Sequence, residues 1–381
     1  MKISLITLGA LVAPALAKVY YAGVAESGGE FGVWNDNGVG RGLPGRFGSD
    51  YAFINKTAID VMIRDDKINL FRIAFLLERI CPPSVGLGKV FNETYFDLFY
   101  DAVQYVTVRK RRYALLDPHN YMRYNDPFGQ PYSGGIIGDV NDPNAASTED
   151  FKIFFTELAK RFRHNTRVIF GIMNEPHDMP TSLVLKNNQA AIDGIRSTGA
   201  KQMILAPANA WSGGHAFTTG NGNEPSSDYL HLMKDPLNNT AIEIHEYLDD
   251  NYSGSGANCT QPVTRLDGVT NWLKQHGLKG IITEFGGGVN PGCAKALTDY
   301  ITYLEEKEVW IGWTAWAAGP LWGYWSPCCQ SGQALGSFEP GSRARDGGPG
   351  LYDLLWVPVL RPLVPKNLGT HGISSVNGTT D

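Results

Sequence analysis

Residues 168–177 read VIFGIMNEPH, and they are the strongest indication of the fold. Its apolar part, residues 168–172, is typical of a strand buried on both faces, and it leads directly into Asn174 and Glu175. Such a strand, ending in polar side chains, is the unit of a parallel sheet with a functional edge. Seven further apolar runs of this kind occur, at residues 19–22, 68–71, 113–116, 203–206, 241–244, 280–283 and 310–314.

Helical patterns fill the gaps between these runs. In segment 148–163, apolar residues recur at helical spacing behind Ser147 or Thr148 as N-cap, and segments 183–196 and 267–275 are similar. Eight strands alternating with helices predict a single-domain α/β fold, the (β/α)₈ TIM barrel. An open doubly wound sheet is the alternative, but no G-x-G-x-x-G pattern follows the first run.

Polar and aromatic side chains follow the apolar runs directly. In a barrel these positions meet at the mouth formed by the carboxyl ends of the strands, where the active site of this fold is built. The sequence therefore predicts one functional site on that rim. Its candidate residues are Arg72, Asp117 to Tyr121, Asn174 to His177, Asn209, His245 to Tyr247, Glu284 to Gly286 and Trp316.

Two glutamates of this rim, Glu175 and Glu284, indicate its chemistry. They follow the fourth and seventh runs, which lie across a barrel from each other, so their carboxyl groups can face one another over a cleft. Hydrolysis of a glycosidic bond needs two such groups, one as proton donor and one as nucleophile or base. The alternative, two solvated loop carboxylates, does not explain why each directly ends an apolar strand.

Other catalytic chemistries lack their motifs. The segment from His245 to Asp249 begins like the zinc motif H-E-x-x-H, but Asp249 stands where the second histidine is required. Neither a G-x-S-x-G nucleophile elbow nor a phosphate-binding loop occurs in the sequence. We therefore expect neither a metal nor a cofactor.

The amino-terminal segment predicts secretion. Residues 1–17 combine a lysine, an apolar run too short to span a bilayer, and small residues before the end, as in a cleavable signal peptide. The catalytic domain would occupy residues 18–368, with a loose tail at residues 369–381. The net charge of −5 and six Asn-x-Ser/Thr sequons favour a secreted glycoprotein over a nucleic-acid or membrane protein. We expect an extracellular monomer, with the occupancy of the sequons left open.

Eight stretches, in this order along the chain, resemble one enzyme family. They are Glu26 to Gly32, Leu43-Pro44-Gly45, Phe71-Arg72, Asp117 to Tyr121, Asn174-Glu175-Pro176, His245-x-Tyr247-x-Asp249, Thr283 to Gly287 and Trp316 to Gly319. Together they make the sequence similar, over about residues 21–324, to fungal endoglucanases of glycoside hydrolase family 5, in clan A. The resemblance implies a retaining endo-β-1,4-glucanase, or cellulase, on a TIM barrel.

The resemblance also implies roles for the two carboxyl groups. Glu175 would be the acid/base and Glu284 the nucleophile of a double displacement. Arg72 would hydrogen-bond Glu284 and keep it ionised, because a nearby guanidinium favours the charged carboxylate.

The remaining rim residues would then support the reaction. Asn174 would reach the 2-hydroxyl of the sugar being cleaved, and His119 would hold another hydroxyl of the same sugar. His245 and Tyr247 would position the two carboxyl groups and carry protons, while Trp316 would supply a stacking floor. Taken singly, each histidine could equally be a satisfied core residue and Trp316 a barrel plug.

Four residues further out are candidates for outer sugar subsites. They are Trp34, Asn209, Trp211 and Trp322, of which Asn209 and Trp211 follow the fifth run. Tryptophan more often packs in a core than binds a ligand, so packing is the alternative for each of the three tryptophans.

The five cysteines predict at least one disulfide in an oxidising compartment. Cys259 and Cys293 match a pair that pins a loop in the family, worth about 3.5 kcal/mol in the chain-entropy model. The adjacent Cys328 and Cys329 cannot easily bond each other, and one of them could pair with Cys81 instead.

The exact polysaccharide stays open. A β-mannanase or a mixed-linkage β-glucanase is the alternative within the enzyme class, because the same barrel serves several β-glycans. A carbohydrate-binding barrel with a dead site is the alternative from another class, disfavoured because Arg72, Asn174 and Tyr247 accompany both glutamates. The insertion at residues 125–144 and the segment after Pro327 flank the cleft and leave the number of subsites open.

Overall fold

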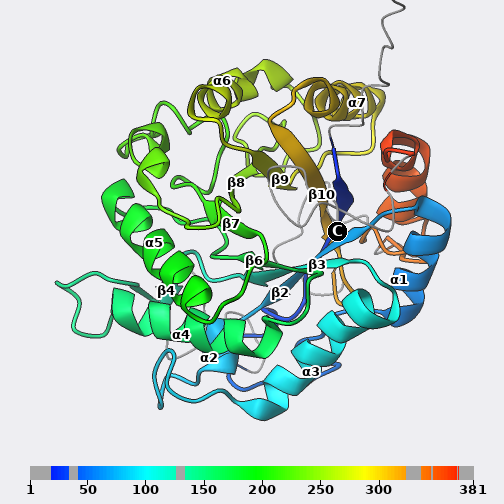
Figure 1. The fold of residues 1–381 in the computed structure, drawn as a ribbon. Coiled ribbons are helices and arrows are strands. Elements are labelled where there is room, and N and C mark those ends of the chain that lie inside the picture. The colour runs from blue at the N-terminus through cyan, green and yellow to red at the C-terminus, as the bar shows by residue number, and fades with distance from the viewer. Residues whose placement is uncertain are drawn as a thin grey trace, which may run out of the picture.

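Eight parallel strands close into a barrel in the order β1-β10-β9-β8-β7-β6-β3-β2 (Figure 1). The structure, a computed structural model, describes residues 19–33, 42–125, 134–322, 336–344, 346–366 and 368. The predicted (β/α)₈ barrel is confirmed. The strands are β1 (Tyr21–Glu26), β2 (Leu70–Phe75), β3 (Tyr113–Pro118), β6 (Val168–Gly171), β7 (Ile204–Pro207), β8 (Thr240–His245), β9 (Gly280–Glu284) and β10 (Trp310–Ala318).

Helices surround the barrel, as Figure 1 shows. The helix predicted at residues 148–163 is present, and it begins with a capping box in which the Ser147 and Asp150 side chains each accept from the other's backbone N–H. The other two predicted helices are present with ends shifted by one or two residues. The helices are α1 (Lys56–Val61), α2 (Leu77–Ile80), α3 (Glu93–Gln104), α4 (Thr148–Phe162), α5 (Thr181–Ser197), α6 (Asp267–His276) and α7 (Pro291–Glu306), with π-helical turns η1 (Met62–Asp66) and η2 (Tyr105–Arg109) and 3₁₀ turns η3 (Ser226–Asp228), η4 (Leu230–Leu232) and η5 (Val263–Leu266).

Inward-facing side chains fill the barrel in layers. The deep layer is apolar, because every second strand residue points inward and these residues are large and hydrophobic. Farther along the same strands the inward positions become polar, as in the step from Leu70 to Arg72 on β2 and from Ala241 to Glu243 on β8. The apolar layer consists of Tyr21, Leu70, Tyr113, Leu115, Ile169, Met203, Leu205, Ala241, Ile281 and Ile311.

The carboxyl-terminal segment packs onto the outside of the barrel. A π-helical segment, η7 (Tyr352–Leu360), continues into η8 (Arg361–Leu363) and lies beside α1 (Figure 1). The Trp356 ring packs 6.4 Å from that of Trp313 on β10, and the Tyr352 hydroxyl hydrogen-bonds Asp66 at the end of η1. The predicted loose tail lies outside the described residues.

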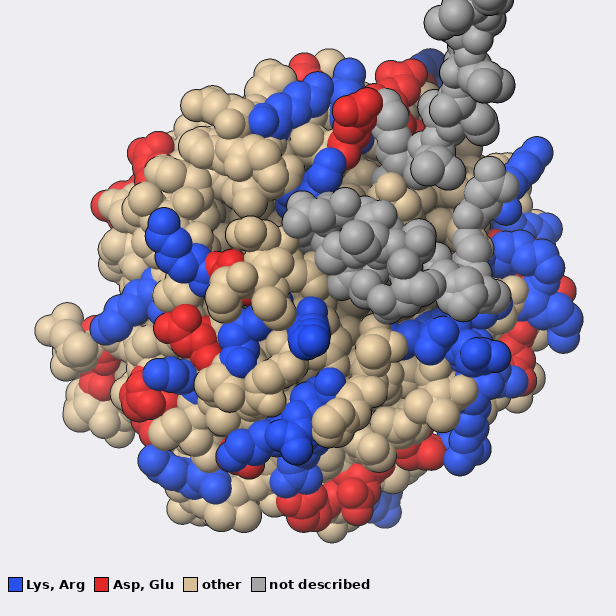
Figure 2. All heavy atoms as spheres, in the orientation of Figure 1, with Lys and Arg blue, Asp and Glu red and all other residues tan. Residues whose placement is uncertain are grey.

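Three further observations concern the insertion, the surface and the helices. The hairpin of β4 (Arg123–Tyr124) and β5 (Gly135–Ile136) forms part of the insertion between the third and fourth barrel strands. On the face shown in Figure 2, basic and acidic side chains are interspersed among uncharged ones. None of the helices in the described ranges is long and apolar enough to cross a membrane.

Two buried carboxyl groups, those of Glu26 at the end of β1 and of Glu339, interact electrostatically. Glu26 is fully buried, and within the described part of the chain neither of its carboxylate oxygens has a hydrogen-bond partner; the same is true of Oε1 of Glu339. Burial, followed by the charge of Glu339, raises the pKa of Glu26 well above its usual value. Burial likewise raises the pKa of Glu339 to about 7, against the hydrogen bonds from Asn55 and the Gly319 N–H. The folded state therefore favours the protonated forms of Glu26 and Glu339.

We expect the stability of the protein to fall as the pH rises from about 4.5 to about 7. In this window the folded protein keeps a proton on Glu339 that the unfolded chain releases, so through Glu339 alone raising the pH favours unfolding by about 3 kcal/mol. Urea unfolding at a series of pH values measures the dependence, and Glu339→Gln should make it less steep, with the contribution of Glu26 remaining. Glu306→Gln, at an exposed position, should leave it unchanged. An equal slope in wild type and Glu339→Gln would refute the assignment.

Candidate active site

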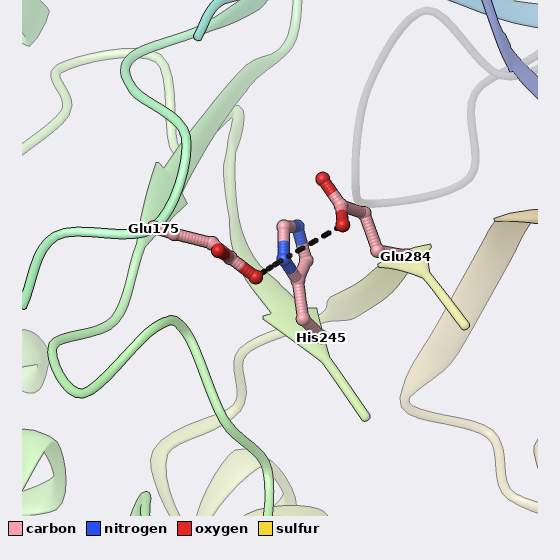
Figure 3. A group of neighbouring side chains, drawn as sticks. All are labelled: Glu175, His245 and Glu284. Carbon is pink, nitrogen blue, oxygen red and sulfur yellow. Dashed lines mark hydrogen bonds and ion pairs between the residues drawn. The ribbon is translucent and has the colours of Figure 1, made fainter. Parts of the chain in front are cut away.

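The two glutamates singled out from the sequence face each other at the barrel mouth (Figure 3). Glu284 is the last residue of β9, and Glu175 lies in the loop after β6 with a left-handed backbone (φ 43°). His245, the last residue of β8, stands between them. A carboxylate oxygen of each glutamate and a ring nitrogen of His245 all lie within 4.8 Å of one another.

Glu175 is placed to hold a proton. Its Oε1 lies 2.7 Å from Nδ1 of His245, and the residue is only partly buried because it lines a cavity. Burial raises the pKa of Glu175, and the neighbouring charge of Glu284 raises it further, against the opposing effect of His245. This carboxyl group can therefore offer a proton to a ligand in the cavity.

Glu284 is held in the opposite state. Nη1 of Arg72 lies 2.7 Å from its Oε1, and the Tyr247 hydroxyl donates a hydrogen bond of 2.9 Å to its Oε2. Burial favours the neutral form, but the positive charges of His245 and Arg72 outweigh it and lower the pKa of Glu284. A pair of carboxyl groups whose pKa values are pushed apart in this way separates an acid from a carboxylate.

Arg72 organises the base of the site. Its side chain is fully buried, and its guanidinium lies 3.2 Å from Asp117 and 3.6 Å from Glu243 in addition to Glu284. Burial opposes the charge, but these three carboxylates raise the pKa of Arg72. Nη2 also donates to Oδ1 of Asn174 over 2.6 Å, so the cation fixes the orientation of that amide.

His119 and Asn174 are hydrogen-bonded to each other at the base of the site. Because Oδ1 of Asn174 accepts from Arg72, its Nδ2 must be the atom that lies 3.1 Å from Nε2 of His119. The other ring nitrogen of His119 lies 2.9 Å from Asp117. Burial lowers the pKa of His119, but Asp117 raises it and so favours a proton on both ring nitrogens. The hydrogen bond from Asn174 has the opposite requirement, because it needs a lone pair on Nε2. Among the described residues the second N–H of this amide has no partner, so it can serve a ligand.

Trp316, near the end of β10, covers one side of the site. Its ring stacks on His119 with centroids 5.2 Å apart, and the guanidinium carbon of Arg72 lies 5.8 Å from its centroid. Trp322 packs edge-on against Trp316 at 5.3 Å and is only 4% exposed. In this structure Trp322 packs against the ring of Trp316, and its role as an outer sugar platform stays a prediction.

A cavity of about 410 Å³ opens beside Glu175. Trp211 is 39% exposed there and stacks on His177 with centroids 4.5 Å apart, so it remains a candidate sugar platform. Trp34 lies outside the described residues. The cavity lining includes Glu175, Trp211, His215, His245, Tyr247 and Tyr252.

Asn209 is not positioned to contact a ligand. It is 2% exposed, and its Nδ2 donates to the carbonyl of Met179 and the hydroxyl of Thr181. These bonds anchor the start of α5 to the end of β7. The prediction of Asn209 as an outer subsite is therefore wrong, because a polar residue after a strand can also turn inward to satisfy loop backbone.

Three residues of the network received no role from the sequence. Asp117 and Glu243 are counter-ions of Arg72, and the Thr283 hydroxyl bridges Glu243 and His245. A signal for Glu243 does exist, since it is a lone carboxylate two residues before His245 in an otherwise apolar strand and so shares its inward face.

The group of Glu175, His245 and Glu284 is also the one described cluster with distances that could suit a metal ion. Its acceptor atoms, however, already have charged or hydroxyl donors: Arg72 and Tyr247 on Glu284, and His245 on Glu175. This donor set is that of a hydrogen-bonded acid–base group rather than of a metal site with free ligands.

The expected disulfide is present. Cys259 and Cys293 are bonded with their Cα atoms 4.9 Å apart, which ties the loop after β8 to the start of α7. Cys81 is a buried free thiol among the described residues, and its suggested pairing with Cys328 or Cys329 stays untested. Those two cysteines lie outside the described residues.

Comparison with known proteins agrees with this geometry. Residues 27–320 match the family described as Cellulase (glycosyl hydrolase family 5). Endoglucanase 1 of Robillarda sp. (strain Y-20) is 57% identical over 99% of this chain and 98% of its own, and a probable endo-beta-1,4-glucanase B of Neosartorya fischeri is 39% identical over 82% of this chain and 88% of its own.

Solved structures agree as well. XacCel5A in complex with cellopentaose superposes with a TM-score of 0.76 at 31% identity, covering 91% of this chain and 100% of that one. Cel5A (EG2) from Hypocrea jecorina gives a TM-score of 0.66 at 27% identity over 79% and 89% of the two chains. With its barrel, its carboxyl pair and these matches over most of its length, the chain belongs to glycosyl hydrolase family 5.

Proposed function

We propose that the protein is a secreted endo-β-1,4-glucanase that hydrolyses internal bonds of cellulose or β-glucan with retention of anomeric configuration. The observation that carries the mechanism is the separation of the carboxyl pair. An oxygen of Glu175 and an oxygen of Glu284 lie within 4.8 Å of each other. This close approach of one oxygen from each group supports a carboxyl separation in the range of retaining sites, ~5 to 5.5 Å, over the ~6.5 to 9.5 Å of inverting ones.

The two steps follow from the opposite states of the carboxyl groups. In the first, a Glu284 oxygen attacks the anomeric carbon while Glu175 donates its proton to the departing glycosidic oxygen, leaving a glycosyl ester on Glu284. In the second, the Glu175 carboxylate takes a proton from water as that water attacks the anomeric carbon, and Glu284 leaves as a carboxylate. Both residues return to their starting states.

The surrounding residues would act on the sugar and on charge. The free N–H of Asn174 can reach the 2-hydroxyl, a bond that can strengthen in the transition state. The Trp316 ring gives an apolar face for the sugar being cleaved. The cavity with Trp211 lies on the side of Glu175, where the leaving part of the substrate would sit.

The β-1,4-glucan substrate is supported by the names of the relatives, several of which are endo-β-1,4-glucanases, and by the cellopentaose bound to XacCel5A. A β-mannanase or a mixed-linkage β-glucanase would use the same carboxyl pair, because a fold does not fix the substrate. A binding protein with a dead site is disfavoured, since Glu175 and Glu284 both have their hydrogen-bond partners.

Product analysis on a substrate panel tests this proposal. We expect the highest kcat/KM on carboxymethyl cellulose, lower values on barley glucan and little hydrolysis of galactomannan. An endo-acting enzyme should lower the viscosity of the polymer well before many reducing ends appear. Faster release of sugar from galactomannan than from carboxymethyl cellulose would replace the proposal by a mannanase.

We also propose that residues 1–17 are removed on secretion. The small residues before position 18 and the disulfide support this. Mass spectrometry of the protein from the culture medium should find an amino terminus at or near Lys18.

A further inference from the structure

A third carboxylate, that of Glu243, lies in the barrel beneath His245. Both residues are on β8 and two positions apart, so their side chains share the inward face of the strand. The Thr283 hydroxyl on neighbouring β9 donates to Oε1 of Glu243 over 2.6 Å. The oxygen of the same Thr283 hydroxyl lies 2.9 Å from Nε2 of His245. Glu243 is 2% exposed and Thr283 fully buried, so water does not replace either contact.

The hydrogen atoms in this series of hydrogen bonds, from Glu243 through Thr283 to His245, can be assigned. A threonine hydroxyl has one hydrogen, and Thr283 gives it to Glu243, so its oxygen can only accept from His245. Nε2 of His245 therefore carries a hydrogen. The other ring nitrogen, Nδ1, lies 2.7 Å from Oε1 of Glu175, and here two arrangements compete.

The two arrangements differ in where the acidic proton of Glu175 resides. If Nδ1 of His245 carries a hydrogen and donates it to Oε1, the proton of Glu175 must lie on Oε2, where a ligand can take it. If Nδ1 is bare, it accepts a hydrogen bond from a proton on Oε1, and the acid is turned toward the histidine. Only the doubly protonated His245 leaves Glu175 ready to protonate a leaving group.

We propose that Glu243 is a positioning residue: through Thr283 and by its own charge it keeps His245 doubly protonated, so that the acidic proton of Glu175 faces the substrate. The inference rests on the proposed role of Glu175 as general acid. Oε1 of Glu243 lies 3.7 Å from Nε2 of His245, close enough for its charge to stabilise the imidazolium directly.

The electrostatics around His245 agree with this geometry. Burial alone would lower the pKa of His245, but Glu284, the hydrogen bond with Glu175 and the interaction with Glu243 raise it to about 10. The charged groups that face it are Glu175 from the loop after β6, Glu284 from β9, Asp117 from β3 and Glu243 itself, with Arg72 of β2 beside Glu243.

Glu243→Gln tests the proposal, because the amide keeps an acceptor for Thr283 and removes only the charge. On the alkaline limb of the activity profile, where the variant loses the second proton of His245 at a lower pH than the wild type, we expect kcat/KM for cello-oligosaccharides, whose leaving groups need a proton, to fall by up to roughly tenfold. For a 2,4-dinitrophenyl cellobioside, whose leaving group needs none, it should change by less than about twofold. Loss of a negative charge lowers the pKa of its neighbours, so the alkaline limb of the kcat/KM profile should move down by about one pH unit.

Three further variants guard against a folding defect. Thr283→Val should reproduce the selective loss, and Thr283→Ser, which keeps the hydroxyl, should restore wild-type behaviour. Glu26→Gln removes another fully buried carboxyl group at a strand end and should leave both the leaving-group dependence and the activity profile unchanged.

The outcomes separate this inference from the function on which it rests. An equal loss on both substrates in Glu243→Gln, or an unmoved alkaline limb, would reduce Glu243 to a structural role and overturn the inference. If Glu175→Ala itself showed no selective loss, the proposed acid would be wrong. A selective loss in Glu175→Ala without one in Glu243→Gln would remove only the inference.

Discussion

Glu284→Ala should lower turnover of every β-glucan substrate by roughly four to six orders of magnitude, because no other group is placed to form the covalent intermediate. Added azide should restore part of the activity. It is a small anion that can enter the vacated space next to Arg72, whose cation would otherwise lose its carboxylate partner at 2.7 Å. Since azide then displaces the leaving group in one step, the glycosyl azide should have inverted configuration. Product NMR measures this.

The control for this variant is ligand binding. Trp316 and Asn174 are unchanged, so cello-oligosaccharides should still bind, and calorimetry can show it. Near-wild-type hydrolysis of cellulose, or a glycosyl azide of retained configuration, would rule out Glu284 as the nucleophile.

The barrel could be predicted from the sequence because its strands are buried on both faces. Each apolar run marks a strand, but β2 and β10 continue beyond the predicted runs, to Phe75 and Ala318. The reason is physical: polar residues such as Arg72 still pair in the ladder while their side chains line the upper barrel. A prediction that ends each strand at its first polar residue therefore makes these two strands too short.

The rim residues could be predicted for a related reason. Parallel strands bring their carboxyl ends to one mouth, so Arg72, Asn174, Glu175, His245 and Glu284 had to gather there. Which way a side chain turns beyond the strand end is set by loop packing, which the sequence does not show. Hence the two glutamates predicted from the rim do lie together, whereas Asn209 and Trp322 are buried.

Contacts within the barrel were harder to predict. Glu243 lies inside a strand that otherwise reads as apolar, and only its spacing from His245 indicates that the two share a face. The meeting of Glu26 with Glu339 joins β1 to the closing segment, and no local pattern indicates it. Long-range pairs of this kind depend on how the outer layer docks, which is a tertiary property.

Glu175→Ala should separate the two steps of the reaction more sharply than any other change. With cellulose, turnover should fall by roughly two to four orders of magnitude, because the departing sugar no longer receives a proton. With a dinitrophenyl cellobioside, the glycosyl-enzyme should still form rapidly, seen as a burst of dinitrophenolate, and then persist because no base activates water. Azide should relieve this block by attacking the ester on Glu284, and the second displacement gives a glycosyl azide of retained configuration. The contrast with the inverted azide from Glu284→Ala is what assigns the roles. The same azide stereochemistry in both variants would mean that the acid/base and the nucleophile have not been correctly distinguished.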